Sequence, residues 1–426
     1  MKTRFYNARV LTMANQFEII EGELWVTDDR ISYIGPARPS AGENWDRQID
    51  VQGNLLMPGF KNGHSHSAMT FLRSYADDLP LMDWLHQKIF PMEAKLNGER
   101  VYHLTKLAIM EYLSSGITAN FDMYFFNESI AHAAVDTGFR TVMVGTIFDD
   151  VKQVAEQEAI FHKYQNYADN VSFKLGFHAE YTTNDAVMRE LSALSHRLKQ
   201  PVFAHNSETE TEVAGCIERH GVTPTVYMYE HGLFDYGGGG YHCVHLSERD
   251  KQIFLEKDLS IITNPAANLK LASGIADINS VLKMGINIGI GTDGPAGNNA
   301  LDMFREMFLV SGLAKVVCQD AAVVDGYDVL KMATIGSAKA MGLTDCDVLA
   351  VGKKADLIMI DLNQPNMQPL NNIVKNIVYS GSKSNIKLTM IDGIVRYEDG
   401  NYFIGDSTER VYQKANQIIA EIKSEL

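Results

Sequence analysis

Histidines that end short apolar runs are the residues of this chain best suited to chemistry. His64 and His66 are separated by one residue in GHSH, and because alternate side chains of a strand share a face, both imidazoles would point the same way. His205 and His242 lie at or near the ends of two later runs, and Asp293 ends a third in GIGTDGP. Surface histidines can fall at this spacing by chance. However, buried polar groups without partners cost several kcal/mol, so four imidazoles and a carboxylate at strand ends predict a bound metal ion.

The predicted donors are nitrogen and oxygen atoms without a thiolate, a set that suits Zn2+ and also accepts Fe2+ or Mn2+. Three histidines and one Asp leave a coordination position for water. A bound metal lowers the pKa of that water to about 7, so hydroxide is available as a nucleophile at neutral pH. The pattern therefore predicts hydrolytic chemistry. The run VSFKLGFHAE places Lys174 in mid-strand and His178 at the end, so no lysine is in position to carry a carbamate that bridges two metals. We therefore expect one divalent ion per chain.

Glu208 follows His205 by three residues in HNSETE, close enough to face the same site. A Glu at this point could instead begin a helix, where the helix dipole stabilises its charge. We favour a catalytic role, because a buried Glu with a raised pKa can protonate a ring nitrogen while hydroxide attacks the adjacent amine-bearing carbon. Asp293 would take the proton of the water and pass it to the leaving ammonia.

The hydrophobic pattern predicts the elements that bring these residues together. From Leu55 onward, apolar runs of strand length alternate with amphipathic stretches of helix length, which indicates repeated βα units. Eight such units over residues 55–342 predict an α/β fold, a (β/α)8 TIM barrel whose strand ends converge on one mouth. The predicted strands are LLMPGFKNGHSH, TANFDMYF, RTVMVGTIF, VSFKLGFHAE, PVFAHNSE, GYHCVHL, LSIITNPAANL and INIGIGTD.

Short strand-like runs also occupy both ends of the chain. Residues 1–54 carry RFYNARVLTM and GELWVTDDRISYIG, and residues 343–426 carry GKKADLIMIDL and KLTMIDGIVRYEDGNYF before a polar amphipathic stretch. Because neither side has enough strands for an independent sheet, we expect both ends to pair into one small composite β domain, followed by a terminal helix. The glycines from Gly237 to Gly240 are predicted to form a flexible turn before the sixth barrel strand.

Composition excludes several classes of protein. The 426 residues include 38 Lys and Arg against 53 Asp and Glu, and a net charge of -15 would repel phosphate backbones, so nucleic acid is not an expected partner. We expect no membrane span and a cytoplasmic location, because there is no apolar run of the required length and no apolar core of a signal peptide. Four cysteines without a C-x-x-C pair indicate reduced thiols. Homo-oligomerisation is left open.

Five motifs in order resemble those of the amidohydrolase superfamily: MPGFKNGHSH, FAHNSE, HCVHLSE, NPAANLKLASG and GTDGPAGNNALDMFREM. They are similar in particular to the adenosine-type deaminases that act on S-adenosylhomocysteine and 5'-methylthioadenosine, which form the 6-oxopurine nucleoside and ammonia. The resemblance implies the metal ligands His64, His66, His205 and Asp293, and a catalytic Glu208. It also implies that His242 steadies the attacking hydroxide, with His245 of the same H-C-V-H-L motif as the competing choice.

The same resemblance implies contacts to a nucleoside. Glu208 would be one of these contacts. In addition, Trp84 would pack on the purine, Glu93 would accept from the ribose hydroxyls and His178 would contact the sugar. Each of the three could equally be an ordinary packed or surface residue. Members that act on S-adenosylhomocysteine commonly have an Arg before the fourth barrel strand, whereas this chain has YQNYADNVSFKLG there, and Ala267 where Ser is usual. Because a bidentate carboxylate contact is hard to replace, we expect 5'-methylthioadenosine, 5'-deoxyadenosine or adenosine to serve at least as well.

Two other functions are weighed against this one. A related hydrolase could act on guanine, cytosine or another amino- or chloro-heterocycle, since fold does not fix the substrate. Ammonia release from an adenosine would separate these enzymes. A non-catalytic barrel kept as a binding module would have lost metal ligands, and this sequence has lost none of them.

Overall fold

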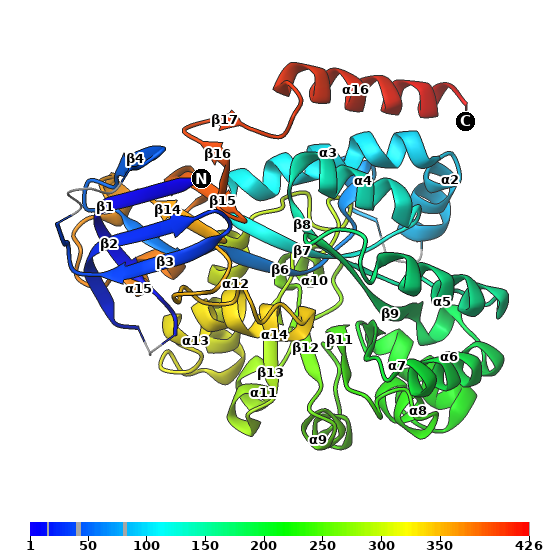
Figure 1. Cartoon of the computed structure of the whole chain (residues 1–426). Helices are drawn as coiled ribbons and strands as arrows, with labels where there is room; N and C mark the ends of the chain where they lie inside the picture. The colour runs from blue at the N-terminus through cyan, green and yellow to red at the C-terminus, as the bar shows by residue number, and fades with distance from the viewer. Residues whose placement is uncertain (15–16, 40–43, 80–82, 426) are drawn as a thin grey trace.

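The computed structural model describes residues 1–14, 17–39, 44–79 and 83–425 (Figure 1). As predicted, eight parallel strands follow one another in chain order around a nearly closed barrel. The barrel strands are β6 (Phe60–Ser65), β7 (Ile117–Met123), β8 (Arg140–Val144), β9 (Val171–Ala179), β10 (Val202–Asn206), β11 (Gly238–His242), β12 (Ser260–Thr263) and β13 (Asn287–Ile290).

Helices surround the barrel (Figure 1). Polar side chains cap several of them: Asn97 accepts from the Arg100 N–H at the start of α3, and Asn184 accepts from two N–H groups at the start of α6. Buried residues recur along one side of α6, including Val187 and Leu191, as expected for a helix packed on a sheet. The α-helices from β6 to the end of the barrel are α2 (Phe90–Glu93), α3 (Gly98–Ser114), α4 (Asn127–Thr137), α5 (Lys152–Tyr164), α6 (Asp185–Leu198), α7 (Glu210–His220), α8 (Pro224–Glu230), α9 (Glu248–Glu256), α10 (Pro265–Lys270), α11 (Ile278–Met284), α12 (Met303–Cys318), α13 (Gly326–Lys331) and α14 (Ser337–Met341).

The barrel closes where its first strand, β6, meets the segment that follows its last strand, β13. The Asp293 N–H donates to the His64 carbonyl oxygen at 3.0 Å across this seam. Asn62 completes it with two side-chain hydrogen bonds of 2.8 Å, donating to Thr292 Oγ1 and accepting from the Thr292 N–H. All four residues are buried, so the seam is a fixed part of the barrel interior.

The two ends of the chain form one nine-stranded sheet, as predicted for the composite β domain. Its strands run in the order β17-β16-β15-β14-β5-β1-β2-β3, and β4 pairs with β1. The pairing of β14 with β5 joins the C-terminal strands to the N-terminal ones. The strands are β1 (Lys2–Leu11), β2 (Ile19–Thr27), β3 (Arg30–Gly35), β4 (Arg47–Asp50), β5 (Leu55–Pro58), β14 (Leu357–Ile360), β15 (Ile386–Ile391), β16 (Ile394–Glu398) and β17 (Asn401–Tyr402).

Three local predictions are wrong. The run LSIITNPAANL is a strand only over β12, because a helix, α10, begins at Pro265. The run LLMPGFKNGHSH is two strands rather than one: β5 pairs with β1 and β14 in the terminal sheet, and the barrel begins at Phe60. The chain division at residues 54/55 and 342/343 stays a prediction. Gly238 to Gly240 belong to β11 instead of a turn, because neighbouring strands approach too closely for side chains. A Cβ at Gly238 would lie 2.0 Å from the Val202 carbonyl oxygen.

In the described part of the chain, the α-helices after the barrel are α15 (Ile373–Tyr379) and the terminal α16 (Thr408–Ser424). The predicted terminal helix packs against α3 of the barrel, with Val411 and Ile418 buried and Lys106 paired with Asp406 at 2.7 Å (Figure 1). Within the described residues, no helix is both long and apolar enough to cross a membrane. The cytoplasmic location stays a prediction.

Replacing Asn62 with Leu keeps the side-chain size but removes both of its bonds across the seam. We expect the free energy of unfolding to fall by about 2 kcal/mol, because the Thr292 N–H is left buried without a partner. Urea unfolding followed by circular dichroism measures the change. Asn416→Leu, at an exposed position of α16, is the matched control and should shift stability by less than about 0.5 kcal/mol. Equal losses in both variants would contradict the role of the seam.

Candidate metal centre and active site

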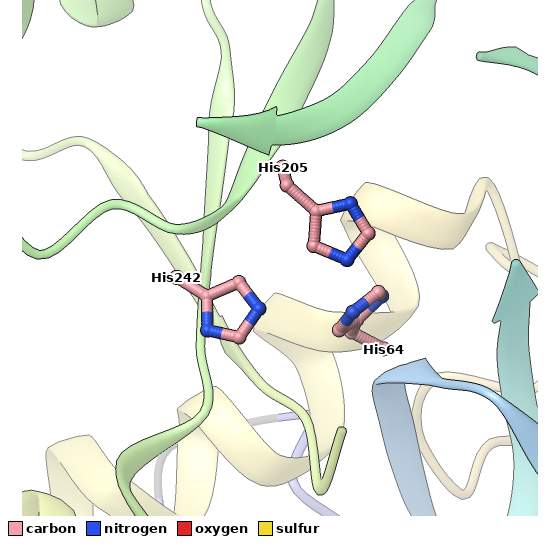
Figure 2. Close-up of side chains that lie close together, drawn as sticks. All are labelled: His64, His205 and His242. Carbon is pink, nitrogen blue, oxygen red and sulfur yellow. The ribbon is translucent and has the colours of Figure 1, made fainter. Parts of the chain in front are cut away.

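The predicted chemical residues meet in one cavity at the carboxyl ends of the barrel strands. Ring nitrogens of His64, His205 and His242 lie within 4.8 Å of one another, and donor atoms of His64, His66 and Asp293 form a second group within the same distance. Figure 2 shows the rings of His64, His205 and His242 turned toward a common centre. The structure therefore brings together all four predicted ligands, with His242 beside them.

Asp293 is the carboxylate of this cluster. Its Oδ1 atom lies 3.3 Å from Nε2 of His66 and 3.6 Å from Nε2 of His64. The Gly294 N–H donates to the same oxygen at 2.6 Å, which fixes the carboxylate direction. Burial alone would raise the pKa of Asp293, but its hydrogen bond with His66 and the charge of that ring hold the pKa below its usual value. Asp293 is therefore ready to bind a cation as a carboxylate.

The histidine rings are held in a low-dielectric environment. Burial, followed by the charges of neighbouring histidines, lowers the pKa of His64 and of His205 well below the usual value. For His66, burial acts to lower the pKa, but the hydrogen bond with Asp293 outweighs it and the pKa is raised. Neutral imidazoles are the form that binds metals, so burial prepares His64 and His205 as ligands.

Hydrogen bonds behind the cluster fix the direction of two rings. The Nδ1–H group of His205 donates to the His178 carbonyl oxygen at 2.7 Å, and that of His242 donates to Asn268 Oδ1 at 2.7 Å. In each ring the remaining nitrogen, Nε2, is thereby left as an acceptor. Asn268 lies on α10, which follows β12, whereas His242 ends β11. A residue beyond one strand therefore orients the ring at the end of its neighbour.

Glu208 reaches the same cavity from the segment that follows β10. Ser273 Oγ donates to its Oε1 at 3.0 Å, and its Oε2 lies 3.9 Å from His242 Nε2. The backbone of this segment is held by Glu212, which accepts from the N–H groups of Ser207 and Glu208 at 2.9 and 2.7 Å. Burial raises the pKa of Glu212 to about 7. Ser273 thus holds the Glu208 carboxylate, and Glu212 holds its backbone.

His245, the competing choice for a catalytic histidine, lies elsewhere. Its Nε2–H group donates to the Ser273 carbonyl oxygen at 2.6 Å, and it lines a neighbouring hollow. His242 lines the cavity that holds the metal cluster. The geometry therefore favours His242, because its ring faces both Glu208 and the cluster.

The residues implied in substrate contact also line this cavity. Trp84 is buried at the start of a helical turn, η2 (Trp84–Ile89). Glu93 ends α2 and accepts from the Tyr124 hydroxyl at 2.5 Å, and burial raises its pKa to about 7. His178 lies on β9, where burial lowers its pKa to about 3. Their roles stay predictions, but their positions are compatible with one substrate that touches all three.

Sequence reasoning missed several cavity residues. Phe125 and Phe148 line the cavity beside His178, whose ring stacks on Phe148 at a centroid distance of 4.9 Å. Both Phe residues follow barrel strands closely, β7 and β8, where the mouth of a barrel is built, so their position was a usable signal. The sequence carries no signal for the roles of Asn268 and Glu212. The partner of Asn268 lies on another segment, and Glu212 accepts from backbone N–H groups.

Comparison with known proteins gives the family. Residues 55–395 match the amidohydrolase family. The chain belongs to this family. It is 36% identical over 403 residues to a 5-methylthioadenosine/S-adenosylhomocysteine deaminase of Thermoanaerobacter pseudethanolicus, covering 92% of this chain and 93% of the relative. It is 39% identical over 396 residues to a protein of the same name from Desulforamulus reducens, covering 91% and 92%.

A solved structure resembles the whole chain. The crystal structure of an adenosine deaminase from Xanthomonas campestris with bound zinc superposes with a TM-score of 0.93 at 31% identity, covering 99% of this chain and 98% of the other. This chain is therefore a hydrolase of a metal-dependent family.

The residues present fit a divalent metal ion. Both ring nitrogens of His64 are buried and have no hydrogen-bond partner in the described part of the chain. A buried polar group without a partner needs an explanation, and a cation among nitrogen and oxygen donors supplies one.

Replacing His66 with Ala removes one donor of the cluster. We expect the protein to bind zinc at least about 100-fold more weakly. This loss of affinity is larger than that expected from changing a residue that only supports a ligand. Elemental analysis and zinc titration against a chelator measure this. His132→Ala, at an exposed position of α4, is the control and should keep the metal of the wild type. One full equivalent of tightly held metal in His66→Ala would contradict the ligand assignment.

Proposed function

We propose that this protein is a mononuclear, metal-dependent deaminase that converts a 6-aminopurine nucleoside to the 6-oxopurine nucleoside and ammonia. The observation that carries the proposal is the meeting of a His/His/His/Asp cluster with Glu208 and His242 in one cavity. The names of the relatives, which are 36% and 39% identical over nearly the whole chain, support a nucleoside substrate. Adenosine, 5'-deoxyadenosine, 5'-methylthioadenosine and S-adenosylhomocysteine are the candidates.

His64, His66, His205 and Asp293 would hold the ion, with Zn2+ the first choice and Fe2+ or Mn2+ as alternatives. A bound ion of this kind supplies Lewis acidity and lowers the pKa of a coordinated water to about 7. The support for zinc is the donor set together with the zinc in the adenosine deaminase from Xanthomonas campestris.

Hydrolytic deamination moves two protons. Water oxygen bonds to the ring carbon that carries the amine, the adjacent ring nitrogen gains a proton, and the carbon–nitrogen bond then breaks as ammonia leaves. Glu208 is placed to give the first proton, because Ser273 holds one of its oxygens and leaves Oε2 facing His242. Asp293 takes one proton of the attacking water and gives it to the leaving ammonia. The other proton of that water leaves the hydroxyl group as the carbonyl forms and returns to Glu208, so the enzyme ends in its starting state. His242 orients that water, because Asn268 fixes its ring.

The cavity wall supports a purine nucleoside of defined orientation. With the reacting ring carbon at the metal cluster, Trp84 would pack on the base and Glu93 would accept from the ribose hydroxyls. His178 would contact the sugar. Purified protein assayed for ammonia release with adenine nucleosides, guanine, cytosine and a chlorotriazine tests this assignment. Activity on guanine, cytosine or the triazine alone would move the protein to the alternative substrate class.

Glu208→Gln keeps the size of the side chain but removes the transferable proton. We expect kcat to fall at least about 100-fold while metal content stays near normal, because Glu208 is not among the proposed ligands. Steady-state kinetics with elemental analysis on the same sample measures both. Glu210→Gln, an exposed neighbour at the start of α7, is the matched control. A Glu208→Gln enzyme within a few fold of the wild type would exclude the proton-transfer role.

His242 and His245 make a second comparison within one motif. His242→Ala should lower kcat at least about 100-fold, because it removes the ring that faces Glu208 and the cluster. His245→Ala should cost less than about tenfold, because its ring bonds to a backbone carbonyl outside the cavity. Kinetics of both variants with 5'-deoxyadenosine measures the difference, and the reverse order would reassign the catalytic histidine.

A further inference from the structure

The two serines on either side of His66 share one partner. The hydroxyl of Tyr112, on α3, lies 2.6 Å from Ser65 Oγ and 3.0 Å from Ser67 Oγ. The helix α3 packs on β7 and on η1 (Ser67–Leu72), a helical turn that begins directly after His66. Tyr112, Ser65 and Ser67 are all buried, so bulk water does not compete for these hydrogen bonds.

The protons of these hydroxyl groups can point in only one direction. The carbonyl oxygen of Asp293 can only accept, so Ser65 Oγ donates to it at 3.2 Å. Because each hydroxyl has a single proton, Tyr112 must then donate to Ser65, and Ser67 must donate to Tyr112. At the far end, Nδ2 of Asn120, on β7, donates to Ser67 Oγ at 2.8 Å. The four bonds form one directed chain that ends on the backbone of a proposed metal ligand.

The backbone of Asp293 is the part of the site that needs such support. Its φ is 59°, in the left-handed region that residues with a side chain rarely adopt. Its carbonyl oxygen also accepts from Thr292 Oγ1 at 3.0 Å, but that contact comes from the neighbouring residue. Ser65, by contrast, belongs to β6, so its bond ties the Asp293 carbonyl to the first barrel strand.

His66 is held by β7 from the same side. Asp122 Oδ1 accepts from the Ser67 N–H at 2.8 Å, which fixes the backbone directly after His66. The Nδ1–H group of His66 donates to the Met123 carbonyl oxygen, and its Nε2 lies 3.3 Å from Asp293 Oδ1. The chain of hydroxyls therefore touches the segments that carry both of these proposed ligands.

We propose that Tyr112 is a positioning residue of the metal centre, which sets the direction of His66 and Asp293 through the hydroxyls of Ser65 and Ser67. The inference rests on the ligand set of the proposed function. The Tyr112 hydroxyl bonds to the serines and not to the donor atoms of the ligands, so it contributes direction instead of coordination. Losing an outer contact of this kind typically costs about 10- to 100-fold in metal affinity.

Tyr112→Phe keeps the ring and removes the hydroxyl. We expect zinc, titrated against a chelator, to bind about 10- to 100-fold more weakly. The absorption spectrum of the Co2+-loaded protein should also change, because it reports the directions of the ligands. Tyr102→Phe is the matched control: it lies on the same helix and loses a 2.8 Å hydrogen bond to Asp136, yet should keep the wild-type affinity and spectrum.

Urea unfolding of both variants separates positioning from stability. If Tyr112 has only a structural role, Tyr112→Phe will unfold more easily but keep the zinc affinity and the cobalt spectrum of the wild type, and the inference is overturned. A wild-type protein that binds no zinc would overturn the proposed function itself. A zinc-binding wild type with a Tyr112→Phe variant of equal affinity would overturn only the role of Tyr112.

Ser65→Ala tests the route of the effect. It removes both the acceptor of the Tyr112 proton and the donor to the Asp293 carbonyl, so zinc affinity should fall about as far as in Tyr112→Phe. The double variant should lose less than the product of the two single losses, because both changes break one chain. Losses that multiply fully would contradict an action through Ser65. If Tyr112→Phe does not fold, wild-type zinc affinity in Ser65→Ala would overturn the inference by itself.

Discussion

The hydrogen bond from the Asp293 N–H to the His64 carbonyl oxygen is the contact on which the site depends. It joins the first barrel strand to the segment after the last, so the metal cluster takes donors from both sides of the seam. A ligand set divided in this way exists only in the closed barrel. Asn62 and Thr292 reinforce the closure from inside the barrel, where water cannot replace their hydrogen bonds.

Around that fixed centre, the molecule separates positioning from chemistry. Strand ends present the histidines, whereas later segments hold them in direction: Asn268 of α10 orients His242, and Glu212 of α7 fixes the backbone that carries Glu208. These outer contacts are short and mostly buried, so they cost entropy once, during folding, and leave little to reorganise when substrate arrives. The arrangement explains why chemically important side chains come from segments far apart in the sequence.

Much of this could be predicted from the residues, and the failures have physical causes. Strand alternation placed His64 and His66 on one face, and repeated βα units gave the barrel. The split of the run from Leu55 to His66 into two strands was not visible, because β5 and β6 are both buried at every position, so no alternation of polar and apolar residues marks the boundary between them. The glycines of β11 look like a turn, and only the spacing of β10 and β12 shows that strands need them.

Contacts such as that of Asn268 with His242 cannot be predicted without coordinates, because 26 residues separate the partners and an Asn on a short helix has many uses. The wall of the cavity beside His178 has a different origin. There, Phe125 and Phe148 sit on segments after strands rather than on strands, and such segments can change without disturbing the seam. Because closure fixes the ligands while these segments line the active-site cavity, one barrel can keep its hydrolytic chemistry and exchange the group that it selects.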